Sequence, residues 1–223
     1  IENPAILEDG TRAFSGEIDR TFLRPLIKNY TRQNKSIEIG GFDAFCLVIN
    51  DKPSGLLKKY IQWGETQGYD QRSVTRLQNP WYRPTIQMQT GVEVLAPRSF
   101  GETFVIYSNP ARHLSLRFYR LHHKYPNSQQ LVGYLNSTLY ILFLETLGNK
   151  SLGQGVLDFF MADFLRMKIP IVLNSSVERA YEQMKNRDIK PIFEEIYETD
   201  RRELDGIIFD ALDLTTGERD AVY

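Results

Sequence analysis

Residues 129–145, QQLVGYLNSTLYILFLE, contain an uninterrupted apolar run at residues 140–144. Leucines recur at positions 131, 135, 139 and 142, a spacing that places them on one side of a helix. Such a helix is stable when its apolar side packs against another element, so we predict a helix over residues 129–145 that packs on a sheet. Asn136 would be a polar side chain on this apolar side, and it should have a hydrogen-bond partner if it is buried.

Short apolar segments upstream of this helix predict strands over residues 42–49, 92–95, 103–107 and 114–119. Residues 42–49 are continuously apolar apart from one aspartate, which is typical of a buried strand. Residues 114–119 alternate, so Leu114, Leu116 and Phe118 would lie on one side of the strand. The other side would carry Ser115, Arg117 and Tyr119. A helix after Pro53 is predicted by the apolar positions Leu56, Leu57, Tyr60 and Ile61.

The remaining sequence is mainly helical in its pattern, with predicted helices over residues 161–167, 177–185 and 200–212. Asp200 is a suitable N-cap for the last of these. Residues 215–218, TTGE, form a capping box that predicts a final short helix. We therefore expect an α/β (α+β) fold: a mixed, mostly antiparallel sheet packed by helices over residues 17–173, a helical subdomain over residues 174–223, and a linker over residues 1–16.

The composition is that of a soluble globular protein, with 42% hydrophobic and 25% charged residues. Cys46 is the only cysteine, so no internal disulfide can form and a cytoplasmic location is expected. One cysteine and three histidines also argue against a zinc-ribbon site. The apolar runs are too short to span a membrane, and the start lacks the apolar core of a signal peptide. The first residue is Ile1, which suggests a piece of a longer protein.

Charge is distributed unevenly along the chain, although the formal net charge is only −1. Residues 20–124 hold sixteen lysines or arginines and seven acidic residues, whereas residues 125–223 hold ten basic and sixteen acidic residues. This asymmetry suggests that one surface meets a polyanion such as DNA. Uneven surface charge without any partner is the alternative, and charge alone does not separate the two.

Three segments carry candidate DNA-binding residues. The segment 112–124 is rich in cations, which neutralise phosphates, and arginine can also bind a guanine edge. Its alternative role is that of an edge strand kept soluble by its charges. The aromatic and cationic residues 81–83 could stack on bases, or could anchor a loop in a core. The basic series in residues 20–35 could follow phosphates or be an ordinary exposed face. The candidates are Arg112, Arg117, Tyr119, Arg120, Lys124, Trp81, Tyr82, Arg83, Arg24 and Lys28.

No catalytic centre is predicted for this chain. Methylation of an adenine needs an Asn-Pro-Pro-Tyr type loop, but residues 79–82 (NPWY) and 109–112 (NPAR) both lack the second proline. Gly40-Gly41 and residues 153–155 (GQG) are not followed by the strand–turn–helix pattern of a cofactor loop. We therefore expect neither a catalytic residue nor a cofactor or metal site in this chain.

Ordered segments of the sequence carry a resemblance to a known family. They are residues 19–28, residues 63–65 with 79–82, residues 131–137 (LVGYLNS), residues 145–148 with 153–157 and 169–170, and residues 200–205 with 208–209 and 218–219. In this order they resemble the C-terminal target-recognition region of adenine-specific DNA methyltransferases and fused restriction–modification enzymes, including TaqI-like specificity domains. The resemblance covers nearly the whole chain but not the family's catalytic domain.

The resemblance implies sequence-specific recognition of double-stranded DNA in a prokaryotic restriction–modification system. It implies that the chain positions a target adenine for an upstream methyltransferase domain of the same protein, and that S-adenosylmethionine binds to that domain. This chain would then have no enzymatic activity by itself. The alternative is an interaction module that docks on a methyltransferase or nuclease subunit without reading DNA, which the acidic, helical second half favours.

Overall fold

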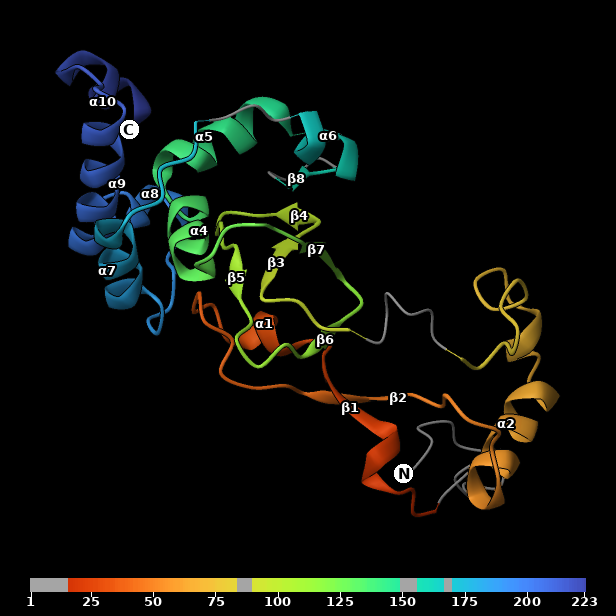
Figure 1. Cartoon of the computed structure of the whole chain (residues 1–223). Helices are drawn as coiled ribbons and strands as arrows, with labels where there is room; N and C mark the ends of the chain where they lie inside the picture. Colours follow the sequence, from red (N-terminus) through yellow and green to blue (C-terminus); the bar gives the residue numbers. More distant parts are fainter. Residues whose placement is uncertain (1–15, 84–89, 149–155, 167–169) are drawn as a thin grey trace. The chain divides into compact units, whose positions relative to one another are not determined.

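The computed structural model describes residues 16–83, 90–148, 156–166 and 170–223 (Figure 1). The chain forms two compact units, which we treat separately. Unit 1 comprises the described residues up to Leu26 together with those of Ala44–Gly91, and unit 2 comprises Ile27–Asp43 with Val92–Tyr223. The functional boundaries predicted near residues 16 and 173 stay predictions, because compactness does not define function. Of the predicted linker over residues 1–16, residues 1–15 lie outside the described residues, as does the glycine segment at 153–155.

Unit 1 is built around one helix. Its elements are the short helix η1 (Arg20–Phe22), strands β1 (Leu23–Ile27, the last residue of which belongs to unit 2) and β2 (Ala44–Leu47), helix α2 (Gly55–Thr66) and the short helix η2 (Tyr69–Gln71). Strands β1 and β2 pair antiparallel, from Leu23 opposite Leu47 to Leu26 opposite Ala44. A small core of Ile49, Leu57 and Ile61 holds the helix, with Trp81 and Tyr82 packed against it.

The helix predicted after Pro53 is confirmed, with Leu57 and Ile61 on its buried side. The buried strand predicted over residues 42–49 is wrong in extent, because only Ala44–Leu47 pairs as a strand. Phe42 and Phe45 are 41% and 56% exposed, whereas Val48 and Ile49 are buried. Only the end of the apolar run therefore lies in a core, so continuous apolarity did not predict burial at every position of this segment.

A three-stranded antiparallel sheet forms the base of unit 2, with strand β3 (Val94–Pro97) between β5 (Tyr107–Ser108) and β7 (Phe118–Leu121). Val94 lies opposite Ser108 on one side and Leu121 on the other, and Pro97 lies opposite Phe118. Strands β4 (Ser99–Phe100) and β8 (Leu157–Asp158) form a second, two-stranded antiparallel sheet. Strand β6 (Leu114–Ser115) and helix α1 (Tyr30–Gln33) complete the β-rich part.

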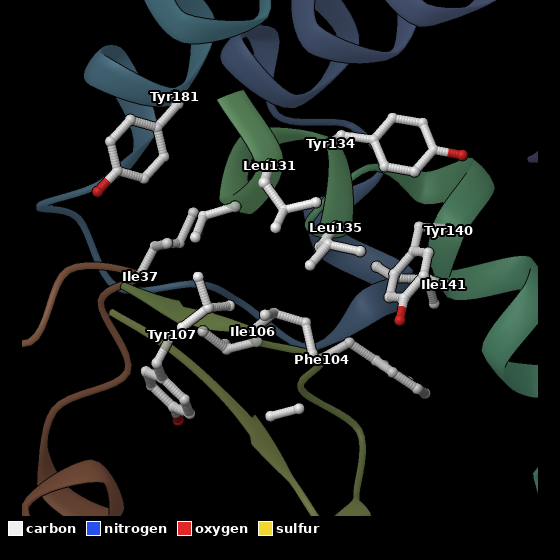
Figure 2. Close-up of a cluster of buried hydrophobic side chains, with 14 of the residues drawn as sticks. Ile37, Phe104, Ile106, Tyr107, Leu131, Tyr134, Leu135, Tyr140, Ile141 and Tyr181 are labelled. Atoms are coloured by element: carbon white, nitrogen blue, oxygen red, sulfur yellow. The ribbon is translucent and has the colours of Figure 1, made fainter. Parts of the chain in front are cut away.

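Helices make up much of the rest of unit 2. They are α4 (Ser128–Leu135), α5 (Thr138–Leu147), α6 (Met161–Arg166), α7 (Ser175–Met184), α8 (Ile192–Glu195), α9 (Thr199–Ala211) and α10 (Thr216–Val222). Helix α4 packs against strand β5 of this sheet, and helix α7 packs against both α4 and α9. Leu131 and Leu135 of α4 point toward Ile106 and the sheet, as Figure 2 shows. The packing of helices on a mostly antiparallel sheet confirms the predicted α+β class.

The single helix predicted over residues 129–145 is wrong, because the chain breaks at Asn136 and Ser137. Asn136 caps the end of α4, and the Ser137 hydroxyl accepts a hydrogen bond from the Tyr140 N–H at the start of α5. The partner expected for Asn136 is confirmed. Its Oδ1 accepts from the Ile106 N–H at 3.1 Å, and its Nδ2 donates to the carbonyls of Ile106 at 2.8 Å and Val132 at 2.9 Å. The polar residue thus ties the helix break to the backbone beside the sheet.

Two strand predictions need correction. The strand expected over residues 103–107 is reduced to β5, which begins only at Tyr107. The strand expected over residues 114–119 is split into β6 and β7, because Leu116 and Arg117 leave the pairing. The alternation is lost with it: Ser115 is buried, whereas Leu116 is 46% exposed.

The C-terminal helices follow the sequence prediction, and the capping box at Thr215 and Glu218 is present. Asp200, however, lies inside α9, which has Glu198 at its N-cap. Of the helix predicted over residues 161–167, the last residue lies outside the described part. No helix among the described residues is long and apolar enough to cross a membrane.

Candidate nucleic-acid interface

A pocket of about 520 Å³ in unit 2 is lined by cationic side chains and by no acidic one. We call it the basic pocket, and its cations are Arg32, Lys35, Arg98 and Arg117. The other lining residues are polar or apolar: Thr31, Pro97, Ser99, Phe100, Thr103, Val105, Tyr107 and Phe118. A concave surface with one sign of charge focuses the electrostatic field and attracts an anion.

Three separate segments bring these cations together. Arg32 lies in the last turn of α1, and Lys35 follows that helix. Pro97 of β3 lies opposite Phe118 of β7. Because Arg98 follows Pro97 and Arg117 precedes Phe118, the antiparallel register brings both arginines to the same end of the strand pair.

No acidic residue that the structure describes neutralises these four cations. All four side chains are exposed, and none forms an ion pair with an acidic residue that the structure describes. The Arg98 guanidinium lies 5.4 Å from the centre of the Tyr119 ring, which holds it by a cation–π contact. Four cations without a carboxylate repel each other, so an anion in the pocket would relieve this repulsion.

The floor of the basic pocket is apolar and rigid. Phe100 and Val105 are buried there, and the Phe100 ring stacks on Phe104 with 5.2 Å between ring centres. Burial raises the pKa of Tyr107 to about 12, so its hydroxyl stays protonated and available as a hydrogen-bonding group beside Thr31. An apolar floor lowers the local dielectric, which strengthens the attraction between the cations and an anion.

The predicted residues on and beside β7 contribute to this pocket to different degrees. Arg117 lines the basic pocket. Tyr119 lies next to Arg98, but its hydroxyl donates to the Phe159 carbonyl at 2.9 Å and its ring packs on Phe164. Arg120 is half-buried on β7, and Lys124 is exposed beyond the end of that strand.

Arg112 lies in a different environment from Arg117. Its φ of 50° is in the left-handed region, at a turn that the buried Asn109 fixes. The Asn109 side chain donates to the carbonyls of Val92 and His113. The NPAR segment therefore stabilises the backbone of this turn. The Arg112 guanidinium forms an ion pair with Glu93 at 2.5 Å, which lowers the pKa of that carboxyl. Its charge is therefore largely offset within the chain.

The remaining candidates are dispersed. Trp81, Tyr82, Arg83 and Arg24 belong to unit 1, whereas Lys28 belongs to unit 2. The Trp81 indole donates to a Glu65 carboxylate oxygen at 3.1 Å, and Arg83 donates to the carbonyl of Asn50. Arg24 is exposed on β1, opposite Cys46.

Lys28 is exposed, and its backbone N–H donates to Asp43 at 2.6 Å. Among the ten candidates, only Arg117 is part of the basic pocket.

Arg98 is the pocket residue that the sequence prediction missed, while Arg32 and Lys35 were noted only as members of a basic series. Arg98 lies between two strands after a proline, and nothing in its neighbourhood marks it as functional. The strand register could have identified Arg98. Once β3 and β7 are paired with Pro97 opposite Phe118, Arg98 lies at the same end of the strand pair as Arg117.

No group of histidine, cysteine and acidic side chains that could hold a metal ion occurs among the residues that the structure describes. The model of one known family matches residues 32–202, which is most of the chain and contains every lining residue of the basic pocket except Thr31. This family is the C-terminal domain of the type II methyltransferase M.Eco57I. The chain belongs to this family of methyltransferase C-terminal domains, in agreement with the resemblance seen in the sequence. No curated protein matches it significantly.

Proposed function

We propose that this chain binds double-stranded DNA and positions a target adenine for an upstream, S-adenosylmethionine-dependent catalytic domain of a prokaryotic restriction–modification enzyme. The basic pocket is the observation that carries the proposal, because it joins four cations that pair with no described acidic residue, within the region matched by the methyltransferase family. The cofactor would bind to the catalytic domain, and the cytoplasm is the compartment in which such an enzyme meets DNA.

In this proposal the basic pocket holds the DNA backbone. Its arginines can each donate two parallel hydrogen bonds to a phosphate, and the lysine adds a point charge. Phosphate contacts fix the position and orientation of a protein on DNA but carry no sequence information. Base reading therefore falls to side chains outside the pocket, for which Arg120 and Lys124 of the same strand region are the candidates.

The test is DNA binding by the chain at several salt concentrations. Fluorescence anisotropy with a labelled duplex should show binding at low salt, and affinity should fall as salt rises because bound counterions are released. A variant with Arg32, Lys35, Arg98 and Arg117 all changed to glutamine should reduce the slope of log affinity against log salt by about 3.6, or about 0.9 for each lost phosphate contact. No binding of any duplex at low salt would overturn the proposal.

A docking module is the second candidate, and one observation favours it. Phe193 and Tyr197 of the acidic C-terminal part are 77% and 71% exposed, as is common at protein interfaces. If the chain only docks on a methyltransferase or nuclease subunit, substitution of Arg112, Arg117 and Arg120 should leave the DNA affinity of the complete enzyme unchanged. If it binds DNA as proposed, the same substitutions should weaken that affinity.

A further inference from the structure

Unit 1 contains a second pocket, of about 190 Å³, with a lining unlike that of the basic pocket. Five of its nine lining residues are aromatic, and the others are aliphatic or glycine. We call it the aromatic pocket, and its rings are Tyr60, Trp63, Tyr69, Trp81 and Tyr82. Its volume is below the roughly 300–1,000 Å³ of sites for drug-sized ligands, so it fits one small ring system.

The rings of this pocket are held in a fixed arrangement. Tyr60 and Trp63 stack with 5.8 Å between ring centres, and Tyr69 meets Trp63 edge to face at 5.6 Å. Trp81 closes the pocket from a loop, and its indole N–H is fixed by Glu65 at 3.1 Å. The apolar faces of these rings, rather than their polar atoms, therefore line the space.

Gly64 makes this arrangement possible. A Cβ atom at this position would lie 2.8 Å from the Trp81 ring, closer than real contacts allow. Without a side chain at Gly64, α2 lets the Trp81 indole approach its backbone directly. A pocket lined by aromatic rings favours a planar guest, since such a guest can form stacked and edge-to-face contacts with them.

The charge around the pocket suits a nucleic acid. Residues 52–83 hold six lysines or arginines and only two acidic residues. Arg72 covers the outer face of Tyr69 at 4.1 Å from the ring centre, and Lys58 and Lys59 are exposed on α2. A nucleobase could thus stack on these aromatic rings while the lysines and arginines bind the phosphates of its strand. Proteins that bind single-stranded nucleic acids combine the same two contacts.

We propose that the aromatic pocket holds one nucleobase that has turned out of the DNA duplex. This inference rests on the proposed DNA-binding function and adds a second, stacking site to it. Enzymes that modify a base remove it from the helix, and the strand is distorted at that point. A stacking site outside the catalytic domain would stabilise that distorted strand and favour the extrusion.

The two tryptophans of the chain, Trp63 and Trp81, both line this pocket, so selective tryptophan emission reports its occupancy. The chain is titrated with three DNA probes of equal length: a paired duplex, a duplex with one unpaired base, and a duplex with an abasic site at the bulge. The bulged base should quench the emission and raise affinity about tenfold over the paired duplex, the order expected for one base stacked on an aromatic ring. The abasic bulge should show neither effect.

Single variants connect the effect to the pocket. Trp63→Leu and Tyr69→Leu should each remove the preference for the bulged base while the affinity for paired duplex is kept. Tyr197→Leu, which removes an exposed aromatic ring from unit 2, should leave the preference intact. Circular dichroism and the midpoint of thermal unfolding identify a variant that fails to fold, and the probe series on the unchanged chain decides the question without any variant.

The outcomes separate this inference from the proposed function. Equal binding of the paired and bulged duplexes without quenching overturns the inference and leaves the proposed function standing. Binding of the bulged duplex alone, with quenching, supports the inference and overturns duplex recognition. Absence of binding to all three probes overturns both. Quenching by a trimethyl-lysine peptide but not by the bulged base would also overturn it, because aromatic cages take such cations.

Discussion

A buried ion network in the C-terminal helices allows a sharp prediction about stability. Glu195 of α8 and Arg201 of α9 are 1% and 0% exposed, and the Glu195 carboxylate accepts from the Arg201 Nε at 3.1 Å. Arg187 reaches the same carboxylate at 2.7 Å and also binds Asp200. We expect Glu195→Gln, which keeps the shape but removes the charge, to destabilise unit 2 strongly.

The size of the effect follows from what Arg201 loses. Its Nη2 lies 3.1 Å from Glu195 without hydrogen-bond geometry, and its Nη1 has no hydrogen-bond partner in the structure. Removal of one partner of a buried ion pair costs about 3–5 kcal/mol. The carboxylates of Asp200 and Asp205 also interact electrostatically with Arg201 and offset part of its charge. We therefore expect a loss near the lower limit, about 3 kcal/mol.

Substitution of the other residue of the pair, Arg201, should reduce the stability of unit 2 much less. Arg201→Met replaces the buried guanidinium with an apolar chain of similar length. Glu195 would still be bound by Arg187 and by the backbone N–H of Lys190 at 3.0 Å, and the buried Asp205 would keep its hydrogen bonds from Thr138 and Tyr223. Removal of one buried ion is costly mainly when its partner is left uncompensated, so we expect a loss below about 1.5 kcal/mol.

Urea unfolding followed by circular dichroism measures both free energies, because most helical residues belong to unit 2. The double variant completes the cycle and gives the coupling between the two positions. The reasoning fails if Arg201→Met costs as much as Glu195→Gln, or if Glu195→Gln costs less than about 1 kcal/mol.

Three further predictions also concern unit 2. The arginines hold the pKa values of Glu195 and Asp200 below their usual range. The stabilisation of unit 2 by these two carboxylates is thus complete above about pH 4.3, and it is lost as the pH falls through their lowered pKa values. Urea unfolding at a series of pH values should therefore show that the stability of Glu195→Gln depends less on acid pH than that of the unchanged chain. Asn136→Leu should cost about 2–5 kcal/mol in the same assay, because it leaves the buried N–H and carbonyl of the Ile106 backbone unpaired; a loss below about 1 kcal/mol would contradict this role. Arg117→Gln should lower the salt slope of DNA binding by about 0.9, whereas Arg112→Gln, whose charge Glu93 already offsets, should change it little; equal effects would contradict the assignment of the pocket.

Local signals in the sequence predicted several elements correctly. The capping box at Thr215 and the helix with Leu57 and Ile61 on one side depend on residues close together in the chain. The class of fold followed from the same signals, as did the need of Asn136 for a partner. The ordered motifs also indicated the methyltransferase family that matches residues 32–202.

The errors arose where pairing partners far apart in the chain decided the outcome. Asn136 broke a continuous helical pattern because its side chain binds the backbone of Ile106, thirty residues away. Ser115 is buried and Leu116 exposed because the chain changes pairing between β6 and β7, an event that alternation cannot report.

The candidate site shows the same division between local and distant information. The sequence by itself determined that the first half of the chain is cationic, and it identified Arg117 as one of ten candidate DNA-binding residues. Only the tertiary structure decided that Arg117 faces Arg98 and joins Arg32 and Lys35, while Arg112 is held by Glu93. The physical reason is that charge acts through space: composition counts cations, but whether a cation is available to an anion depends on which carboxylates the fold brings beside it.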